Sequence, residues 1–114
     1  MYLFDAISPA QAAALRAKAL AMPFEDGART SGIASAGVKV NKQLTAHSAD
    51  AMPLLNEIRA HVMACKLLCV YALPRELVTL MVNQYNGQES YGWHTDNPYI
   101  QGKRTDVSLS LIHI

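Results

Sequence analysis

The segment from Tyr91 to Asp96 contains the residues with the clearest chemistry in this sequence. His94 and Asp96 are separated by one residue. On an extended strand, positions i and i+2 project to the same face, so one imidazole and one carboxylate can reach a single metal ion. With a second histidine they would form the 2-His-1-carboxylate triad of non-haem iron(II) oxygenases, which leaves coordination positions open for a co-substrate and dioxygen. His94 and Asp96 are therefore candidate metal ligands and catalytic residues.

The same tripeptide also suits a site that binds no metal. His94 can hydrogen-bond Asp96 directly, or the pair can lie on a solvated loop. The spacing alone does not choose between these interpretations, and the surrounding sequence has to decide.

The surrounding sequence resembles a known enzyme family. The segment from Asn83 to Asp96 is similar to the iron-binding strand pair of the PKHD-type hydroxylases, in the prolyl-4-hydroxylase-like branch of the Fe(II)/2-oxoglutarate-dependent dioxygenases. Further matches follow the family's order: Asp26-Gly27, Thr30-x-Gly32, Val38-Lys39-x-Asn41-x-Gln43, Leu73-Pro74-Arg75 and Arg104-Thr105-Asp106-Val107-Ser108. The resemblance extends from about Met1 to Ser108.

The resemblance implies a fold and a reaction. The fold would be α+β, with N-terminal helices packed on a partial double-stranded β-helix, a cupin-like jelly roll truncated at its C-terminus. The N-terminal region would span residues 1–76, and the jelly roll would begin in residues 77–114. The reaction would couple oxidative decarboxylation of 2-oxoglutarate to succinate with hydroxylation of a small molecule or a protein side chain. It would require Fe(II), 2-oxoglutarate and dioxygen, with L-ascorbate keeping the iron reduced.

Other polar residues near the candidate ligands have less certain roles. Such enzymes often place a tyrosine near 2-oxoglutarate, so Tyr85 is interpreted either as a co-substrate contact or as a core residue. Asn83 lies two residues earlier on the same face and is a candidate for positioning the co-substrate. Arg104 and Asp106 are interpreted as structural or substrate-side, because the family's co-substrate arginine follows its second histidine.

The family's second iron histidine and its 2-oxoglutarate-anchoring arginine are expected beyond this chain. His113 would come too early for the family's topology to be the third ligand. Residues 109–114 resemble a translated sequencing-library adapter, so we expect a truncated gene fragment that is poorly stable and inactive by itself. A native reading frame ending after Ile114 would contradict that expectation.

Hydrophobic spacing predicts two helices. Ser8 and Gln11 can form a capping box around Pro9, which predicts a helix to about Ala21. A second helix is predicted from near Asp50 to about residue 65. The apolar run 67–73 is either a buried strand or the end of that helix.

The remaining segments are predicted to be extended or irregular. Strands are predicted at 77–85 and 90–94, separated by a turn at Asn86-Gly87. Alternation along the second strand would place Tyr91 and Trp93 on the face opposite His94, packing the shell around the site. Three other segments are predicted as turns and short strands (24–43), a loop (97–102) and extended chain (105–111).

Composition limits the class of protein. The 114 residues, 51% hydrophobic and 17% charged, fit one globular domain or part of one. Ten basic and nine acidic residues without a basic cluster argue against nucleic acid as a partner. No signal peptide or membrane span is evident, which indicates a cytoplasmic protein. Cys65 and Cys69 are predicted to be buried free thiols, His47 to be solvated, and His61 to be a surface or hydrogen-bonded histidine.

Two alternative functions remain at this stage. A cupin-like metal-binding module could use the same sheet without oxidative chemistry, and it would not need the downstream arginine. A nucleic-acid demethylase of the AlkB type shares the His-x-Asp start, and salt-dependent binding to single-stranded DNA would favour it. The oligomeric state is not predicted.

Overall fold

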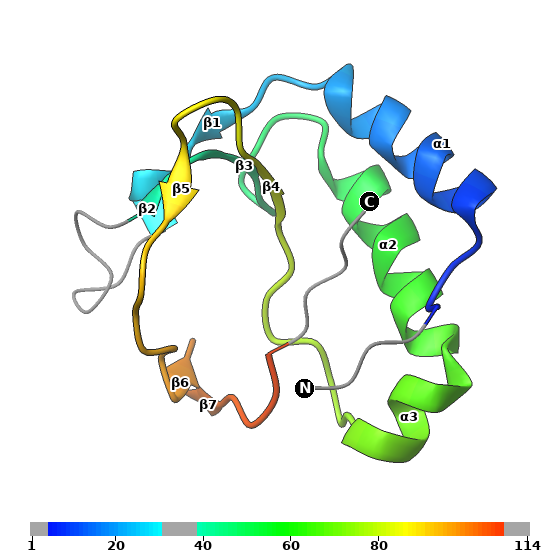
Figure 1. The fold of residues 1–114 in the computed structure, drawn as a ribbon. Helices are drawn as coiled ribbons and strands as arrows, with labels where there is room; N and C mark the ends of the chain where they lie inside the picture. Colours follow the sequence, from blue (N-terminus) through cyan, green and yellow to red (C-terminus); the bar gives the residue numbers. More distant parts are fainter. Residues whose placement is uncertain (1–4, 31–38, 109–114) are drawn as a thin grey trace.

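The computed structural model describes residues 5–30 and 39–108. In Figure 1 the three α-helices lie along one side of the molecule, and the short strands lie along the other together with η1. The helical elements are α1 (Pro9–Leu20), η1 (Gly27–Thr30), α2 (Met52–Ala64) and α3 (Lys66–Ala72). The strands are β1 (Glu25–Asp26), β2 (Lys39–Val40), β3 (Lys42–Leu44), β4 (Val82–Gln84), β5 (Ser90–Tyr91), β6 (Tyr99–Ile100) and β7 (Lys103–Arg104).

The start of α1 confirms the predicted capping box. The Ser8 hydroxyl accepts a hydrogen bond from the Gln11 backbone N–H at 3.2 Å, and the Gln11 side chain accepts one from the Ser8 N–H at 2.9 Å. These bonds satisfy two of the N–H groups that every helix start leaves without an internal partner. The helix ends at Leu20, close to the predicted end.

The second predicted helix is also confirmed, and a third follows it. Residues 67–72 of the apolar run lie in α3, so the prediction of a buried strand is wrong. The run is helical, as the other alternative predicted, but it forms a separate helix after a break. That break is at Cys65, whose backbone is extended between α2 and α3. The third helix ends at Ala72, and the residue that caps it, Leu73, has a left-handed φ of 46° and precedes Pro74. None of the described helices is long and apolar enough to cross a membrane.

The strands form three small antiparallel sheets, in the orders β1-β3-β4, β2-β5 and β6-β7. The predicted strands at 77–85 and 90–94 are shortened to β4 and β5, and these pair with β3 and β2 respectively. A positive φ of 57° at Gly87 is consistent with the predicted turn between them. The N-terminal region was predicted to end at residue 76 and the jelly roll to begin at residue 77. Strand β3 lies before this boundary and β4 after it, so the hydrogen bonds between these two strands join the two predicted regions.

The structure contradicts one prediction for the C-terminal segment and covers only part of another. The predicted loop at 97–102 contains β6 and leads into a hairpin with β7, because Gln101 and Gly102 adopt the two positive φ angles of a tight two-residue turn. Residues 105–108 form no strand, and residues 109–114, including His113, lie outside the described part.

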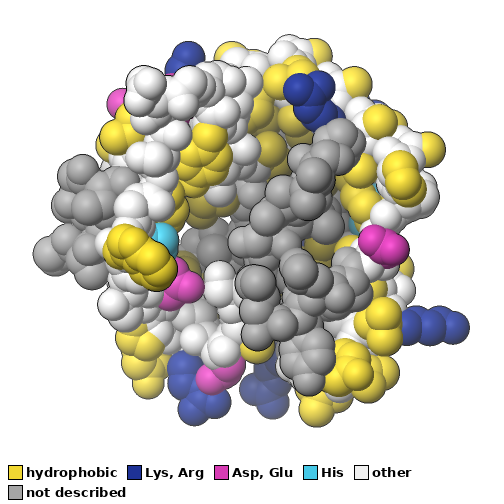
Figure 2. Space-filling model, viewed as in Figure 1, with side chains coloured by type: hydrophobic (Ala, Val, Ile, Leu, Met, Phe, Trp, Pro, Cys, Tyr) yellow, Lys and Arg dark blue, Asp and Glu magenta, His cyan; other side chains and the backbone are white. Residues whose placement is uncertain are grey.

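The core joins the helices to the larger sheet. Leu44 of β3 is fully buried and packs with Leu54 and Leu55 of α2 and with Leu15 of α1. Val82 of β4 packs against the edge of this cluster. The described residues therefore form a mixed structure of helices and small antiparallel sheets, with helices packed on a sheet. Figure 2 shows a hollow in one face, with hydrophobic side chains at its rim and a histidine beside an acidic residue.

Candidate functional site

The structure brings His94 and Asp96 together. His94 Nε2 lies 3.2 Å from Asp96 Oδ1. The predicted proximity is confirmed, but the predicted strand is wrong here, because the extended pairing of β5 ends at Tyr91. Both ligand candidates therefore lie on irregular chain that follows the strand.

A hydrogen bond to the backbone fixes the chemical form of the His94 ring. His94 Nδ1 is 2.8 Å from the Gly92 carbonyl oxygen, and since a carbonyl can only accept, Nδ1 carries the proton. In the neutral ring, Nε2 then presents its lone pair toward the Asp96 carboxylate. The Nε2 lone pair and the Asp96 oxygen are both hydrogen-bond acceptors, so they repel each other unless a cation or a proton lies between them.

The distance between these two donors suits one metal ion. Nitrogen and carboxylate ligands lie about 2.1 Å from a divalent transition metal, so two of them at a right angle are about 3.0 Å apart. The observed 3.2 Å is close to that value. Within residues 5–30 and 39–108, no group of three histidine, cysteine or acidic side chains could hold a metal. The described part of the chain thus supplies two donors.

Tyr91 contacts the histidine directly. Its ring stacks on the His94 imidazole with the centroids 3.7 Å apart and the planes 9° from parallel. The prediction that Tyr91 lies on the opposite face is wrong, because the chain leaves the strand after Tyr91 and His94 comes back over its ring. Trp93 is fully exposed, so its predicted packing around the site is also wrong.

The candidate co-substrate residues lie on and just after β4. Asn83 accepts a hydrogen bond from the Asn41 side-chain amide at 3.1 Å. The side chain of Tyr85 is partly exposed. In the part of the chain that the structure describes, no hydrogen bond, ion pair or ring contact joins either residue to His94 or Asp96. Their predicted roles remain predictions.

Three polar residues that the sequence marks only as part of the family resemblance are buried in the structure. Lys39, Asn41 and Gln43 alternate along β2 and β3, and each is less than a tenth exposed. The Lys39 ammonium donates to Gln43 Oε1 at 3.1 Å and lies 5.5 Å from the centre of the Tyr91 ring. Burial lowers the pKa of Lys39 below its usual value, because desolvation disfavours the charged amine. Their spacing of two residues predicts that the three side chains lie on one face of the strand. A strand face made of polar side chains normally faces solvent, so the sequence gives no signal that this face is buried.

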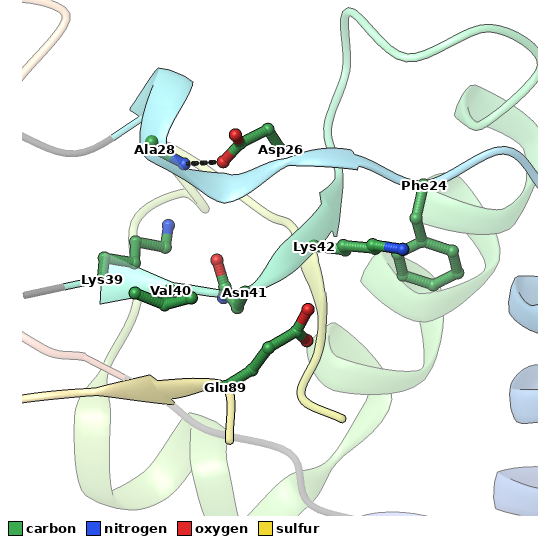
Figure 3. Close-up of a pocket in the computed structure, with 8 residues that line it drawn as sticks. All are labelled: Phe24, Asp26, Ala28, Lys39, Val40, Asn41, Lys42 and Glu89. Carbon is green, nitrogen blue, oxygen red and sulfur yellow. Dashed lines mark hydrogen bonds between the residues drawn. The ribbon is translucent and has the colours of Figure 1, made fainter. Parts of the chain in front are cut away.

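A pocket of about 340 Å³ adjoins this row. Figure 3 shows its lining residues on β1, η1, the 39–42 segment and the chain before β5. Asp26 and Glu89 supply acidic groups, and Lys39 and Lys42 supply basic ones. Asp26 Oδ1 is already engaged, since it accepts from the Ala28 N–H at 2.8 Å. Lys39 of β2 lines the pocket and also lies over the Tyr91 ring, so this residue connects the pocket with the stacked tyrosine.

Arg104 and Asp106 pair with each other at the surface. Their Nε and Oδ1 atoms are 2.7 Å apart, and both side chains are more than half exposed. Such exposed pairs add little to stability. This pairing is compatible with either the structural or the substrate-side interpretation.

The remaining histidines and cysteines lie outside the site. His47 is exposed, as predicted, and His61 is half-buried. Cys65 and Cys69 are free thiols as predicted, but they are half-buried rather than buried: Cys65 lies at the break between α2 and α3, and Cys69 lies within the short α3.

Comparison with known proteins identifies relatives along almost the whole chain. A PKHD-type hydroxylase of Bordetella pertussis is 36% identical over 113 residues, covering 94% of this chain and 50% of the relative. This chain is a homologue of the PKHD-type hydroxylases. PKHD-type hydroxylase YbiX of Escherichia coli is 36% identical, covering 92% of this chain and 49% of the relative. A PKHD-type hydroxylase of Synechococcus sp. is 34% identical, and the match covers 78% of this chain and 40% of the relative.

The homology to PKHD-type hydroxylases confirms the family resemblance found in the sequence. The chain spans about half the length of the curated relatives it matches. No family model matches the chain. No solved structure matches it.

Proposed function

We propose that this chain carries part of the active site of an Fe(II)- and 2-oxoglutarate-dependent hydroxylase. The observation that carries the proposal is the pair His94 Nε2 and Asp96 Oδ1, 3.2 Å apart, in a homologue of PKHD-type hydroxylases. The jelly roll of this enzyme class is part of the proposal, and the short antiparallel sheets would be its first strands.

Each residue of the site has a distinct task. His94 and Asp96 would hold Fe(II), and the Gly92 carbonyl keeps the Nε2 lone pair directed at the metal position. Held by these residues, Fe(II) together with 2-oxoglutarate would supply the activation of dioxygen that hydroxylation of a C–H bond needs. Asn83 and Tyr85 would contact the co-substrate. For Asn83, the hydrogen bond from Asn41 leaves its amide N–H groups available to a carboxylate.

The rest of the proposal concerns the complete enzyme. The third ligand and the arginine that anchors 2-oxoglutarate would come from sequence beyond this chain. Dioxygen and ascorbate would take part, the substrate would be a small molecule or a protein side chain rather than nucleic acid, and the location would be the cytoplasm. With two protein donors in the described residues, we expect the isolated chain to bind a metal weakly and to form no succinate.

The alternative function is a metal-binding module without oxidative chemistry, which would use the same pair of donors, His94 and Asp96. The two functions differ in their response to 2-oxoglutarate. A hydroxylase site leaves adjacent metal positions open, so 2-oxoglutarate should chelate the bound ion and raise the affinity of the chain for Co²⁺. A simple binding module should show no such increase.

Substitution of Asp96 tests the proposed site. Asp96→Ala removes the only charged donor, so the Co²⁺ affinity measured by titration calorimetry should fall at least about tenfold. Asp106→Ala is the matched control, because Asp106 is another exposed aspartate, 2.7 Å from an arginine, and it should leave the affinity unchanged. Equal affinities for the wild type and Asp96→Ala would contradict the proposal.

A further inference from the structure

The buried polar row reaches the candidate metal pair through one aromatic ring. Lys39 and Tyr91 are direct partners in the antiparallel register of β2 and β5, so their side chains lie on the same face of that sheet. Tyr91 in turn stacks on His94. A continuous series of contacts therefore runs from Gln43 through Lys39 and Tyr91 to His94.

The His94 imidazole is attached through Cβ, so its orientation depends on rotation about the Cα–Cβ and Cβ–Cγ bonds. The hydrogen bond from Nδ1 to the Gly92 carbonyl restrains the position of Nδ1. The stacking contact with Tyr91 restrains the tilt of the ring plane. Acting together, the nearly parallel Tyr91 ring and the Gly92 carbonyl leave one orientation, and in that orientation Nε2 faces Asp96.

We propose that Tyr91 and Lys39 are positioning residues that hold His94 in its metal-binding orientation. Tyr91 sets the plane of the imidazole, and Lys39 holds Tyr91 in place. This inference rests on the proposed function for its metal-binding part, whereas the orientation of the ring can be measured without a metal.

Lys39 is suited to this task because it is buried. A cation over an aromatic face is attracted more strongly when water is excluded. The Lys39 ammonium lies 5.5 Å from the Tyr91 centroid, and its hydrogen bond to the fully buried Gln43 keeps it there. The lowered pKa of Lys39 reflects the same exclusion of water.

The test is NMR of the His94 imidazole in the metal-free chain at pH 8, together with Co²⁺ titration. Stacking should shift the His94 ring protons upfield, and the ring nitrogens should report a single tautomer with the proton on Nδ1. Tyr91→Leu should remove the upfield shift, mix the tautomers and lower the Co²⁺ affinity about tenfold, as loss of a supporting contact does at metal sites. Tyr91→Phe keeps the ring and should restore all three properties.

Two further variants separate positioning from general effects on the fold. Tyr99→Leu removes an exposed tyrosine of β6 and should leave the His94 signals and the Co²⁺ affinity unchanged. Lys39→Met keeps an unbranched side chain, one atom shorter, but removes its charge, and should produce part of the Tyr91→Leu effect, about threefold in affinity.

The outcomes distinguish this inference from the proposed function. His94 signals that are unchanged in Tyr91→Leu, or changed equally in Tyr99→Leu, would overturn the role of Tyr91. Wild-type signals in Lys39→Met would overturn the role of Lys39. If the signals respond as predicted but the wild-type chain binds no Co²⁺, the positioning is supported and the proposed function is contradicted.

Discussion

Replacement of His94 by alanine is expected to lower the Co²⁺ affinity of the chain by about 100-fold or more, to the limit of detection. The imidazole is the one neutral nitrogen donor at the site, and its Nε2 atom faces Asp96 at 3.2 Å. Without it, a single exposed carboxylate remains, which binds a transition metal no better than other surface carboxylates. Titration calorimetry on the purified chain measures the change.

A second histidine provides the control for this substitution. His47 is exposed and lies between β3 and α2, so His47→Ala should bind Co²⁺ as the wild type does. If His94→Ala retains wild-type affinity, or if His47→Ala loses it, the metal is held elsewhere and the site assignment is wrong.

Gly27→Ala is expected to destabilise the fold by about 2–4 kcal/mol, because the new methyl group has no space. A Cβ at Gly27 would lie 1.6 Å from Asn41 Oδ1 and 2.9 Å from the Asn41 backbone oxygen. The same backbone oxygen accepts the Gly27 N–H at 2.8 Å. Either this bond must lengthen, or the Asn41 side chain must turn away from Asn83. Urea unfolding followed by circular dichroism measures the loss.

A double-mutant cycle tests the cause of that destabilisation. In Asn41→Ala the side-chain oxygen is gone, so adding Gly27→Ala should cost much less than it does in the wild type. Equal costs in the two backgrounds would show that the clash with the Asn41 side chain is not the cause. Unchanged stability of Gly27→Ala would contradict the close packing of Gly27, at the start of η1, against Asn41.

Local signals in the sequence predicted the parts of the fold that depend on neighbouring residues. The Ser8 capping box places the start of α1 correctly, because its bonds span three residues. The one-residue separation of His94 and Asp96 agrees with the short distance between their side chains, although the backbone there is not a regular strand. The spacing alone did not distinguish metal ligands from a hydrogen-bonded pair, and the resemblance of residues 83–96 to the PKHD-type hydroxylases made them the candidate ligands.

Features that depend on distant parts of the chain could not be predicted in this way. The pairing of β2 with β5 places Lys39 against Tyr91, and this contact joins residues more than fifty positions apart. The stacking of Tyr91 on His94 depends on where the strand ends, and alternation assumes that the strand continues. The three-stranded sheet likewise brings β4 to β3 across two intervening helices.

The most direct test of the central claim is to locate the bound metal. Mn²⁺ broadens the NMR signals of nearby nuclei, so its addition to the ¹⁵N-labelled chain marks the residues around it. If His94 and Asp96 hold the ion, the signals of residues 92–97 should broaden first, and those of α1 should remain sharp. Broadening that begins instead at the acidic residues of the pocket, Asp26 and Glu89, or at Cys65 and Cys69 would contradict the assignment.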